Sequence, residues 1–278
     1  MEKLELKQLK KTANNIRLGI IEGVYNAGCG HPGGSLSIAD ILAYLYFKEM
    51  NIDPANPKCE DRDRFVLSKG HTAPALYATL AERGYIPKED LKTLRKTDSY
   101  LQGHPDMKGT PGVDMTTGSL GLGFSAACGM ALSGKVYGKD YRVFAILGDG
   151  ESEEGQVWEA AMFAAHYKLD NLTCVLDWNG LQIDGPVAEV MNPTPLDEKF
   201  RAFGWHVISI SAHDFEEIEA AFAEARTVVG KPTMIIAKSV KGKGVSYMEN
   251  ECAWHGQAPK EDLYKVAVAD LLAIEKEI

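Results

Sequence analysis

The chain has 278 residues, of which 45% are hydrophobic and 25% charged, which is typical of a soluble globular protein with a substantial core. The net charge of −9 argues against nucleic acid as a partner, because a duplex-binding protein normally presents a basic face. No apolar run reaches the length of a membrane span, and the N-terminal MEKLELKQLKK has no apolar signal region, so we expect no membrane association and a cytoplasmic location.

Helical and strand-like segments alternate along the chain. Helices are predicted at about residues 5–26, from after Ser37 to before Asn51, and at about 72–83, 120–136, 148–168, 194–203, 214–229 and 260–276. Strands are predicted at residues 64–67, 141–147, 172–177, 205–210 and 233–238. This order predicts an α/β fold in which a parallel β-sheet is covered by helices on both faces. Without a repeat or a linker, residues 1–278 are expected to form a single domain.

The segment from Thr97 to Thr117 is rich in Gly, Pro, Asp and Thr and has no clear period. A structureless stretch of this length inside a compact domain is usually functional.

The five cysteines are scattered and include no Cys-x-x-Cys pair. This spacing fits a reducing compartment and excludes an obvious zinc site. Cys128 and Cys174 lie in apolar runs and are expected in the core.

A glycine–acid–glycine turn, Gly148-Asp149-Gly150, ends the predicted strand at 141–147, and Asn179 follows the next strand about thirty residues later. Bare backbone at glycine can approach a phosphate closely, and a helix N-terminus adds free N–H groups. A carboxylate and an amide oxygen at neighbouring strand ends suit magnesium. The sequence therefore predicts a site for a diphosphate held through a metal, a pattern typical of thiamine diphosphate enzymes.

Four histidines lie beside glycines in predicted loops: His31, His71, His104 and His255. A single loop histidine is usually a surface residue, but all four follow predicted elements of a sheet whose carboxyl ends gather ligands. Imidazole can donate to phosphate or to sugar hydroxyls and can carry protons near neutral pH. His166, His206 and His213 are interpreted as structural.

Three further motifs have an ordinary structural interpretation. The glycine-rich turn from Thr116 to Gly123 could serve tight helix packing, because it is not the dinucleotide-binding fingerprint. The Lys241-Gly242-Lys243-Gly244 turn could be solvated. Glu151 and Glu153 are expected to stabilise the first turn of a helix.

Taken together, these motifs resemble the N-terminal, diphosphate-binding half of transketolase. The resemblance rests on seven segments in the family's order: Ala27–Gly34, Ser68–His71, Gly103–Pro105, Thr116–Gly121, Gly148–Gly155, Asn179–Gly185 and His255–Gly256. They extend over nearly the whole chain.

The resemblance implies roles for individual residues. Asp149, Asn179 and the carbonyl of Leu181 would bind magnesium. The diphosphate of thiamine diphosphate would contact His71, Gly150, Asn179 and His255, and the backbone of Gly118, Ser119 and Leu120 would border its pyrimidine side. His31, His104 and His255 would face sugar hydroxyls and shuttle protons, and Glu154 matches an acid that links paired active sites.

The resemblance also implies that the site is incomplete in this chain. Transketolases continue into a pyrimidine-binding domain, which carries the activating glutamate, and a C-terminal domain. We therefore expect a partner subunit that supplies both domains, in an α2β2 heterotetramer that exchanges two-carbon units between sugar phosphates.

Three alternatives remain. The chain could be the α chain of a 2-oxo acid dehydrogenase, although the histidine loops disfavour it. It could belong to a deoxyxylulose-phosphate synthase, although the length disfavours this. It could also be a non-catalytic cofactor-binding subunit, although the polar residues that match the family are intact.

Overall fold

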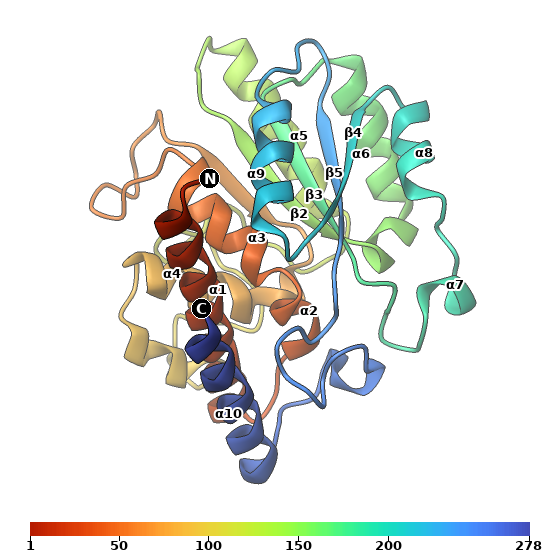
Figure 1. The fold of residues 1–278 in the computed structure, drawn as a ribbon. Helices are drawn as coiled ribbons and strands as arrows, with labels where there is room; N and C mark the ends of the chain where they lie inside the picture. Colours follow the sequence, from red (N-terminus) through yellow and green to blue (C-terminus); the bar gives the residue numbers. More distant parts are fainter.

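In a computed structural model that describes residues 1–278, the chain forms a five-stranded sheet with strand order β1-β2-β3-β5-β4, and every neighbouring pair is parallel (Figure 1). The strands are β1 (Arg64–Leu67), β2 (Val143–Gly148), β3 (Leu172–Trp178), β4 (His206–Ser211) and β5 (Thr233–Lys238). Each lies within two residues of its predicted bounds. The predicted α/β class with a parallel sheet is confirmed.

Helices cover both faces of the sheet (Figure 1). On one side lie α1 (Lys3–Ala27), α3 (Ala39–Tyr44), α4 (Ala73–Arg83) and α9 (Phe215–Ala225), and α10 (Glu261–Glu277) packs against α1. The other face carries α5 (Leu122–Val136), α6 (Gly155–His166) and α8 (Leu196–Ala202). Because successive strand residues point to opposite faces, Phe144 and Ile146 of β2 belong to the first core, whereas Ala145 and Leu147 belong to the second.

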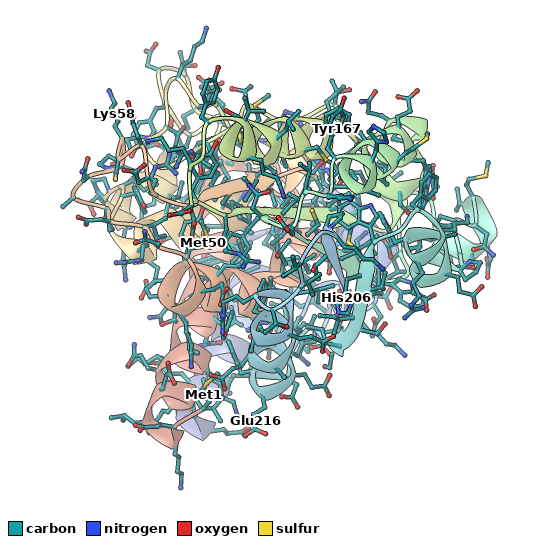
Figure 2. All side chains as sticks on the ribbon, turned by 90° about the horizontal axis from the view of Figure 1, so that it is seen from above. Met1, Met50, Lys58, Tyr167, His206 and Glu216 are labelled. Atoms are coloured by element: carbon teal, nitrogen blue, oxygen red, sulfur yellow. The ribbon has the colours of Figure 1, made fainter.

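The cysteines predicted in the core are there, since Cys128 is 1% exposed and Cys174 is fully buried. No helix is both long and apolar enough to cross a bilayer. At the N-terminus, the amino group of Met1 pairs with Glu219 of α9 at 2.9 Å, and Figure 2 shows Met1 close to Glu216 of the same helix.

Several short elements were not predicted. α2 (Pro32–Leu36) begins directly after His31, and α7 (Val187–Val190) follows β3. A π-helical turn (Leu45–Glu49) ends the segment that begins with α3, and short 3-10 turns cover Gly70–Thr72, Lys88–Thr93 and Cys252–His255. The glycine–acid–glycine turn does not open an α-helix directly, because a 3-10 turn (Gly150–Glu153) comes before α6.

The long loop predicted at 97–117 contains no helix or strand. Tight turns lie at its start, with positive φ angles at Arg95 (59°), just before the loop, and at Asp98 (64°) within it. It places His104 against Gly118, two residues before Leu120, which lines the cavity at the carboxyl ends of the strands.

Candidate cofactor and metal site

A cavity of about 400 Å³ lies at the carboxyl ends of β2, β3 and β5, where ligands of parallel α/β sheets gather. Eight of the predicted site residues line it: His71, Leu120, Asp149, Gly150, Glu154, Asn179, Leu181 and His255. The remaining four, His31, His104, Gly118 and Ser119, lie outside this lining, although His31 packs against two lining histidines.

Asp149 is the N-cap of the 3-10 turn and is only 3% exposed. Its two carboxylate oxygens accept hydrogen bonds from the backbone N–H groups of Gly150 (2.8 Å) and Gly180 (2.6 Å). No cationic side chain forms an ion pair with it. Burial, followed by the neighbouring charge of Asp177, raises the pKa of Asp149 to about 6. It is therefore a buried carboxylate that lacks a positive partner.

Asn179 follows β3 and is oriented by Asp177, a buried carboxylate that the sequence motifs did not single out. The Asn179 amide nitrogen donates to Asp177 at 3.0 Å, so its carbonyl oxygen is turned the other way, where it accepts from the N–H of Leu181 at 3.1 Å. Asp177 also accepts from Lys69 at 2.6 Å and from Ser37 at 2.7 Å. Because one carboxylate holds both Lys69 and Asn179, it fixes two walls of the cavity.

Lys241 is not in a solvated turn, and that interpretation of the Lys-Gly-Lys-Gly segment is wrong. Its side chain is only 2% exposed and donates to the Leu181 carbonyl and to Nδ1 of His255, both at 2.9 Å. The turn packs inward because Gly242 donates to the carbonyl of Gly33 at 2.9 Å and has a φ of +79°. A Cβ at Gly242 would lie 2.3 Å from the Met248 carbonyl, so only glycine fits.

Lys241 also has no carboxylate partner. Burial, with a further contribution from Lys69, lowers the pKa of Lys241 to about 8. At neutral pH it is a buried cation that no anion neutralises.

Three of the predicted histidines form one cluster. The ring centroid of His31 lies 5.1 Å from that of His71 and 5.5 Å from that of His255, and the rings of His71 and His255 are 5.4 Å apart. Burial is the main cause that lowers their pKa values, to about 4 for His31, 2 for His71 and 3 for His255. They are therefore neutral near pH 7, and Nδ1 of His31 is buried without a hydrogen-bond partner.

His104 is exposed and lies against the glycine-rich turn instead of the cluster. A Cβ at Gly118 would come within 3.2 Å of its ring, and a Cβ at Gly70 would come within 2.6 Å of the Thr117 hydroxyl. These close approaches bring the Gly118–Leu120 backbone beside the loop that carries His71. The turn therefore does more than pack a helix.

From its position, Glu151 was expected to stabilise the first turn of an α-helix. The structure shows a different role. It lies in the 3-10 turn, is 3% exposed, and accepts from the backbone N–H groups of Gly148 (3.0 Å) and Gly121 (2.9 Å). It also accepts from the hydroxyl of Ser68, and that hydroxyl accepts from the N–H of Phe124 at 2.9 Å. One carboxylate thus joins the loops after β1 and β2 to the start of α5.

Glu153 and Glu154 remain near the surface, and Glu153 accepts from Gln182 at 2.7 Å. Glu154 is exposed at the rim of the cavity. No group of three or more His, Cys, Asp and Glu side chains is arranged to hold a metal. The predicted magnesium ligands are the carboxylate of Asp149 and two neutral oxygens, from Asn179 and the Leu181 carbonyl. Magnesium prefers oxygen ligands of this kind.

Residues 8–271 match the protein family described as transketolase, thiamine diphosphate binding domain. The chain belongs to the transketolase family. The expected resemblance is thereby confirmed, and the matched region of this transketolase homologue is the cofactor-binding domain.

Two curated relatives have nearly the same length as this transketolase homologue. The 6-deoxy-6-sulfo-D-fructose transketolase subunit SqwG of Clostridium sp. (strain MSTE9) is 51% identical over 263 residues, which are 95% of this chain and 96% of that protein. One of the subunits of the apulose-4-phosphate transketolase of Phocaeicola vulgatus is 42% identical over 268 residues, with 96% of this chain and 95% of that protein covered.

Solved transketolases are longer. The structure of transketolase from Campylobacter jejuni superposes with a TM-score of 0.89 at 33% identity, over 97% of this chain and 45% of that one. The chain thus spans less than half of that transketolase.

Proposed function

We propose that this chain is the N-terminal, cofactor-binding subunit of a split transketolase and that it acts as one domain over residues 1–278. With a C-terminal partner subunit, it would transfer a two-carbon ketol unit from a ketose phosphate to an aldose phosphate. The required cofactors would be thiamine diphosphate and magnesium, and the cytoplasm would be its location, consistent with its five free cysteines.

The observation that carries this proposal is a pair of unneutralised buried charges in one cavity. Asp149 and Lys241 line the same 400 Å³ space, and neither forms an ion pair. Burying a lone charge is costly, and a buried charge is normally paired or bound to a metal. A magnesium–diphosphate complex supplies the missing partner of each, a cation for Asp149 and an anion for Lys241.

In this proposal, Asp149, Asn179 and the Leu181 carbonyl hold magnesium. Gly150, Asn179, His71, His255 and Lys241 contact the diphosphate, and the Gly118–Leu120 backbone supports the cofactor on its pyrimidine side. When bound, thiamine diphosphate supplies the electron sink for cleaving and remaking the carbon–carbon bond. The chain supplies positioning and electrostatic stabilisation.

The histidines would handle the protons of the sugar. Neutral His31 would exchange a proton through Nε2, because its unpartnered Nδ1 is buried out of reach of a substrate hydroxyl. Because Lys241 donates to Nδ1 of His255, the Nε2 atom of that ring carries the proton and can donate into the cavity. His104 would contact substrate hydroxyls from the opposite loop.

The proposal of a partner subunit is supported by exposed apolar side chains on the helices that follow the glycine-rich turn and the Gly148-Asp149-Gly150 turn. α5, α6 and the residues just after them expose large apolar side chains: Leu122 (52%), Val136 (67%), Tyr137 (76%), Met162 (57%) and Tyr167 (47%). Large apolar side chains exposed on two helices that pack against each other fit a protein interface. Glu154 directly precedes α6, one of these two helices. We infer an α2β2 heterotetramer in which Glu154 links the paired sites and the partner supplies the pyrimidine pocket and the activating glutamate.

The test is a two-carbon transfer assay with magnesium and thiamine diphosphate, with and without the C-terminal subunit encoded in the same genome. Donors would include xylulose 5-phosphate, fructose 6-phosphate and 6-deoxy-6-sulfofructose, with ribose 5-phosphate as acceptor. We expect transfer only with both chains present. Oxidative decarboxylation of a 2-oxo acid instead would favour the dehydrogenase alternative, and no reaction with any donor would favour a non-catalytic subunit.

A further inference from the structure

We propose that His213 is a positioning residue for the cofactor cavity, and that it holds Lys241 in place through a hydrogen bond to the neighbouring backbone. His213 lies two residues after the end of β4, in the loop before α9, and it does not line the cofactor cavity. The inference rests on the proposed function, because the ligand that it concerns is the diphosphate that Lys241 would contact.

The first observation is that the sheet hydrogen bonds of β5 stop just before Lys241. The N–H of Ser239 still donates to the carbonyl of Trp178 on the neighbouring strand β3, at 3.0 Å. The N–H of Val240 donates instead to a side chain, to Nε2 of His213 at 2.9 Å. Lys241 is the next residue, so this bond restrains the backbone from which its buried side chain leaves the sheet.

The second observation is that no other backbone hydrogen bond of residues 240–242 depends on a side chain. The carbonyl of Lys241 accepts from the N–H of Asn250 at 2.8 Å, and the N–H of Gly242 donates to the carbonyl of Gly33 at 2.9 Å. Both of these bonds join backbone to backbone. His213 is therefore the position at which a single substitution releases one restraint on Lys241.

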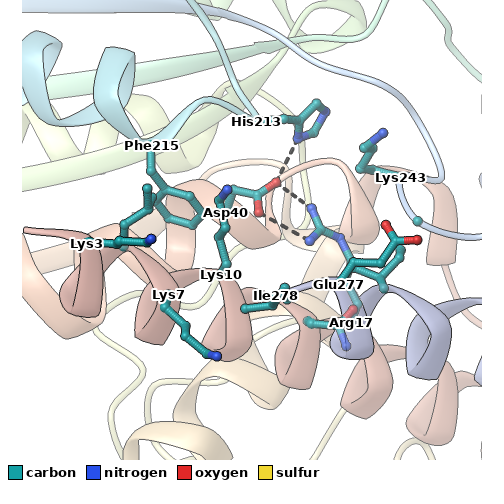
Figure 3. Close-up of a pocket in the computed structure, with 14 residues that line it drawn as sticks. Lys3, Lys7, Lys10, Arg17, Asp40, His213, Phe215, Lys243, Glu277 and Ile278 are labelled. Atoms are coloured by element: carbon teal, nitrogen blue, oxygen red, sulfur yellow. Dashed lines mark hydrogen bonds and ion pairs between the residues drawn. The ribbon is translucent and has the colours of Figure 1, made fainter. Parts of the chain in front are cut away.

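The third observation is that a buried ion pair holds the imidazole of His213. Nδ1 of His213 lies 2.7 Å from the carboxylate of Asp40 on α3, and Arg17 on α1 donates to both oxygens of that carboxylate, as Figure 3 shows. Asp40 is 6% exposed and Arg17 is 7% exposed. Burial alone would raise the pKa of Asp40, but Arg17 and His213 hold it well below its ordinary value, so the carboxylate stays charged.

These contacts fix which ring nitrogen of His213 carries the proton. Because Nε2 accepts from Val240, the proton of the neutral ring is on Nδ1, which donates it to Asp40. The carboxylate thereby orients the ring and leaves the lone pair of Nε2 directed at the backbone of the turn. The ion pair of α1 and α3 thus supports the turn from behind.

The position of the turn matters because Lys241 has to reach two acceptors at once. Its ammonium group donates to the carbonyl of Leu181 and to Nδ1 of His255, both at 2.9 Å. Groups that bind a ligand are effective when they are held within about 0.5 Å of the required geometry. The ammonium group is at the end of a flexible four-carbon side chain, so its position depends on a fixed backbone.

The test is calorimetric titration of thiamine diphosphate, with magnesium, into the assembled two-subunit enzyme. His213→Ala should weaken binding about fivefold, which is the contribution expected of one hydrogen bond. In the Lys241→Met background the same substitution should change affinity by less than about twofold, because it acts through Lys241. His206→Ala is the control at the other end of β4. It removes a contact with Glu224 at 2.6 Å and should leave the affinity unchanged.

Two further variants separate positioning from a general loss of stability. His213→Asn keeps a donor near the place of Nδ1 and loses the acceptor for Val240, whereas His213→Gln can place an amide oxygen near the place of Nε2. We expect His213→Gln to retain more cofactor affinity than His213→Asn. In the free chain, the amide of Val240 should exchange with solvent faster in His213→Asn than in His213→Gln, and the amide of Ser239 should exchange equally in both.

The possible results distinguish this inference from the proposed function. No binding of thiamine diphosphate to the native assembly would overturn the proposed function, and amide exchange in the free chain would still test the contact between His213 and Val240. Binding to the native assembly that His213→Ala leaves unchanged would overturn the positioning role. An equal loss in the Lys241→Met background, or equal affinities of the Asn and Gln variants, would also overturn it.

Discussion

The ammonium group of Lys241 lies 2.9 Å from Nδ1 of His255, and this contact joins the turn after β5 to the histidine cluster. It orients the His255 ring and fixes which nitrogen carries the proton. Since Lys241 is the cation that no carboxylate neutralises in the cavity, its positive charge is available to a diphosphate.

Lys241→Met should therefore weaken thiamine diphosphate binding to the assembled enzyme by at least tenfold, because hydrogen bonds to charged groups contribute about 1.5–3 kcal/mol. Lys243→Met is the matched control, since it removes the same charge two residues away, from a side chain that pairs with Glu249 at 3.2 Å and does not line the cofactor cavity. Calorimetry with both variants decides the matter. Equal losses of affinity would mean that the overall charge of the turn matters and the contact does not.

Glu151→Gln tests the carboxylate that joins three loops of the site. Its two oxygens accept from two backbone N–H groups and one hydroxyl, whereas an amide presents a donor to at least one of them. We expect cofactor affinity to fall about tenfold or more and the melting temperature of the chain to drop.

Glu153→Gln, in the same 3-10 turn but near the surface, is the control and should change neither quantity by much. An unchanged cofactor affinity in Glu151→Gln would show that the three loops keep their places without this carboxylate.

The pKa of Asp149 predicts two effects of pH. Metal binding requires the carboxylate, so magnesium affinity should fall as the pH drops below about 6, and binding near that pH should release a proton. The folded carboxyl also takes up a proton more readily than the unfolded one. The metal-free chain should therefore lose stability as the pH rises from about 4 to 6, by on the order of 2 kcal/mol.

Denaturant unfolding of the metal-free chain at pH 4.5 and pH 7, compared with Asp149→Asn, isolates this contribution. Between these two pH values the native chain should lose unfolding free energy because Asp149 becomes charged. Asp149→Asn, which cannot ionise, should not show this part of the loss. Parallel pH profiles for the two proteins would contradict a raised pKa at Asp149.

The histidines should divide by role. His31→Ala and His104→Ala should lower the turnover of the assembled enzyme more than its cofactor affinity, because their expected partners are sugar hydroxyls. General acid–base groups contribute on the order of a hundred- to ten-thousand-fold in rate. His71→Ala should weaken cofactor binding first. Steady-state kinetics at saturating and limiting cofactor separate these effects, and one shared profile for all three variants would refute the division.

Two of the predicted site residues, Asp149 and Asn179, come together for a reason that is visible in the sequence, because each directly follows a strand. Asp149 and Asn179 end β2 and β3, which are paired neighbours in the sheet, so strand order alone brings them together. Likewise, the parallel sheet followed from the alternation of helical and strand-like segments, and its hydrophobic runs gave the strand bounds within two residues.

Sequence failed where a side chain's environment depends on distant backbone. Lys241 is buried because Gly242 packs on Gly33 of α2, a helix that was not predicted. Glu151 turns inward because its turn is 3-10, and its acceptor role depends on Gly121, thirty residues earlier along the chain. The local sequence around Lys241 and Glu151 is the same as in turns whose lysine or glutamate is exposed to solvent. It therefore carries no signal that these two side chains are buried.

The central claim, that the cavity around Asp149 holds thiamine diphosphate through magnesium, is tested most directly by calorimetric titration of the cofactor into the assembled two-subunit enzyme. The titration is run with native chain and with Asp149→Ala, each with and without magnesium. We predict magnesium-dependent binding to the native assembly and at least a hundredfold weaker binding to Asp149→Ala, with the fold intact by circular dichroism. Undiminished, magnesium-dependent binding to the Asp149→Ala assembly would contradict the account.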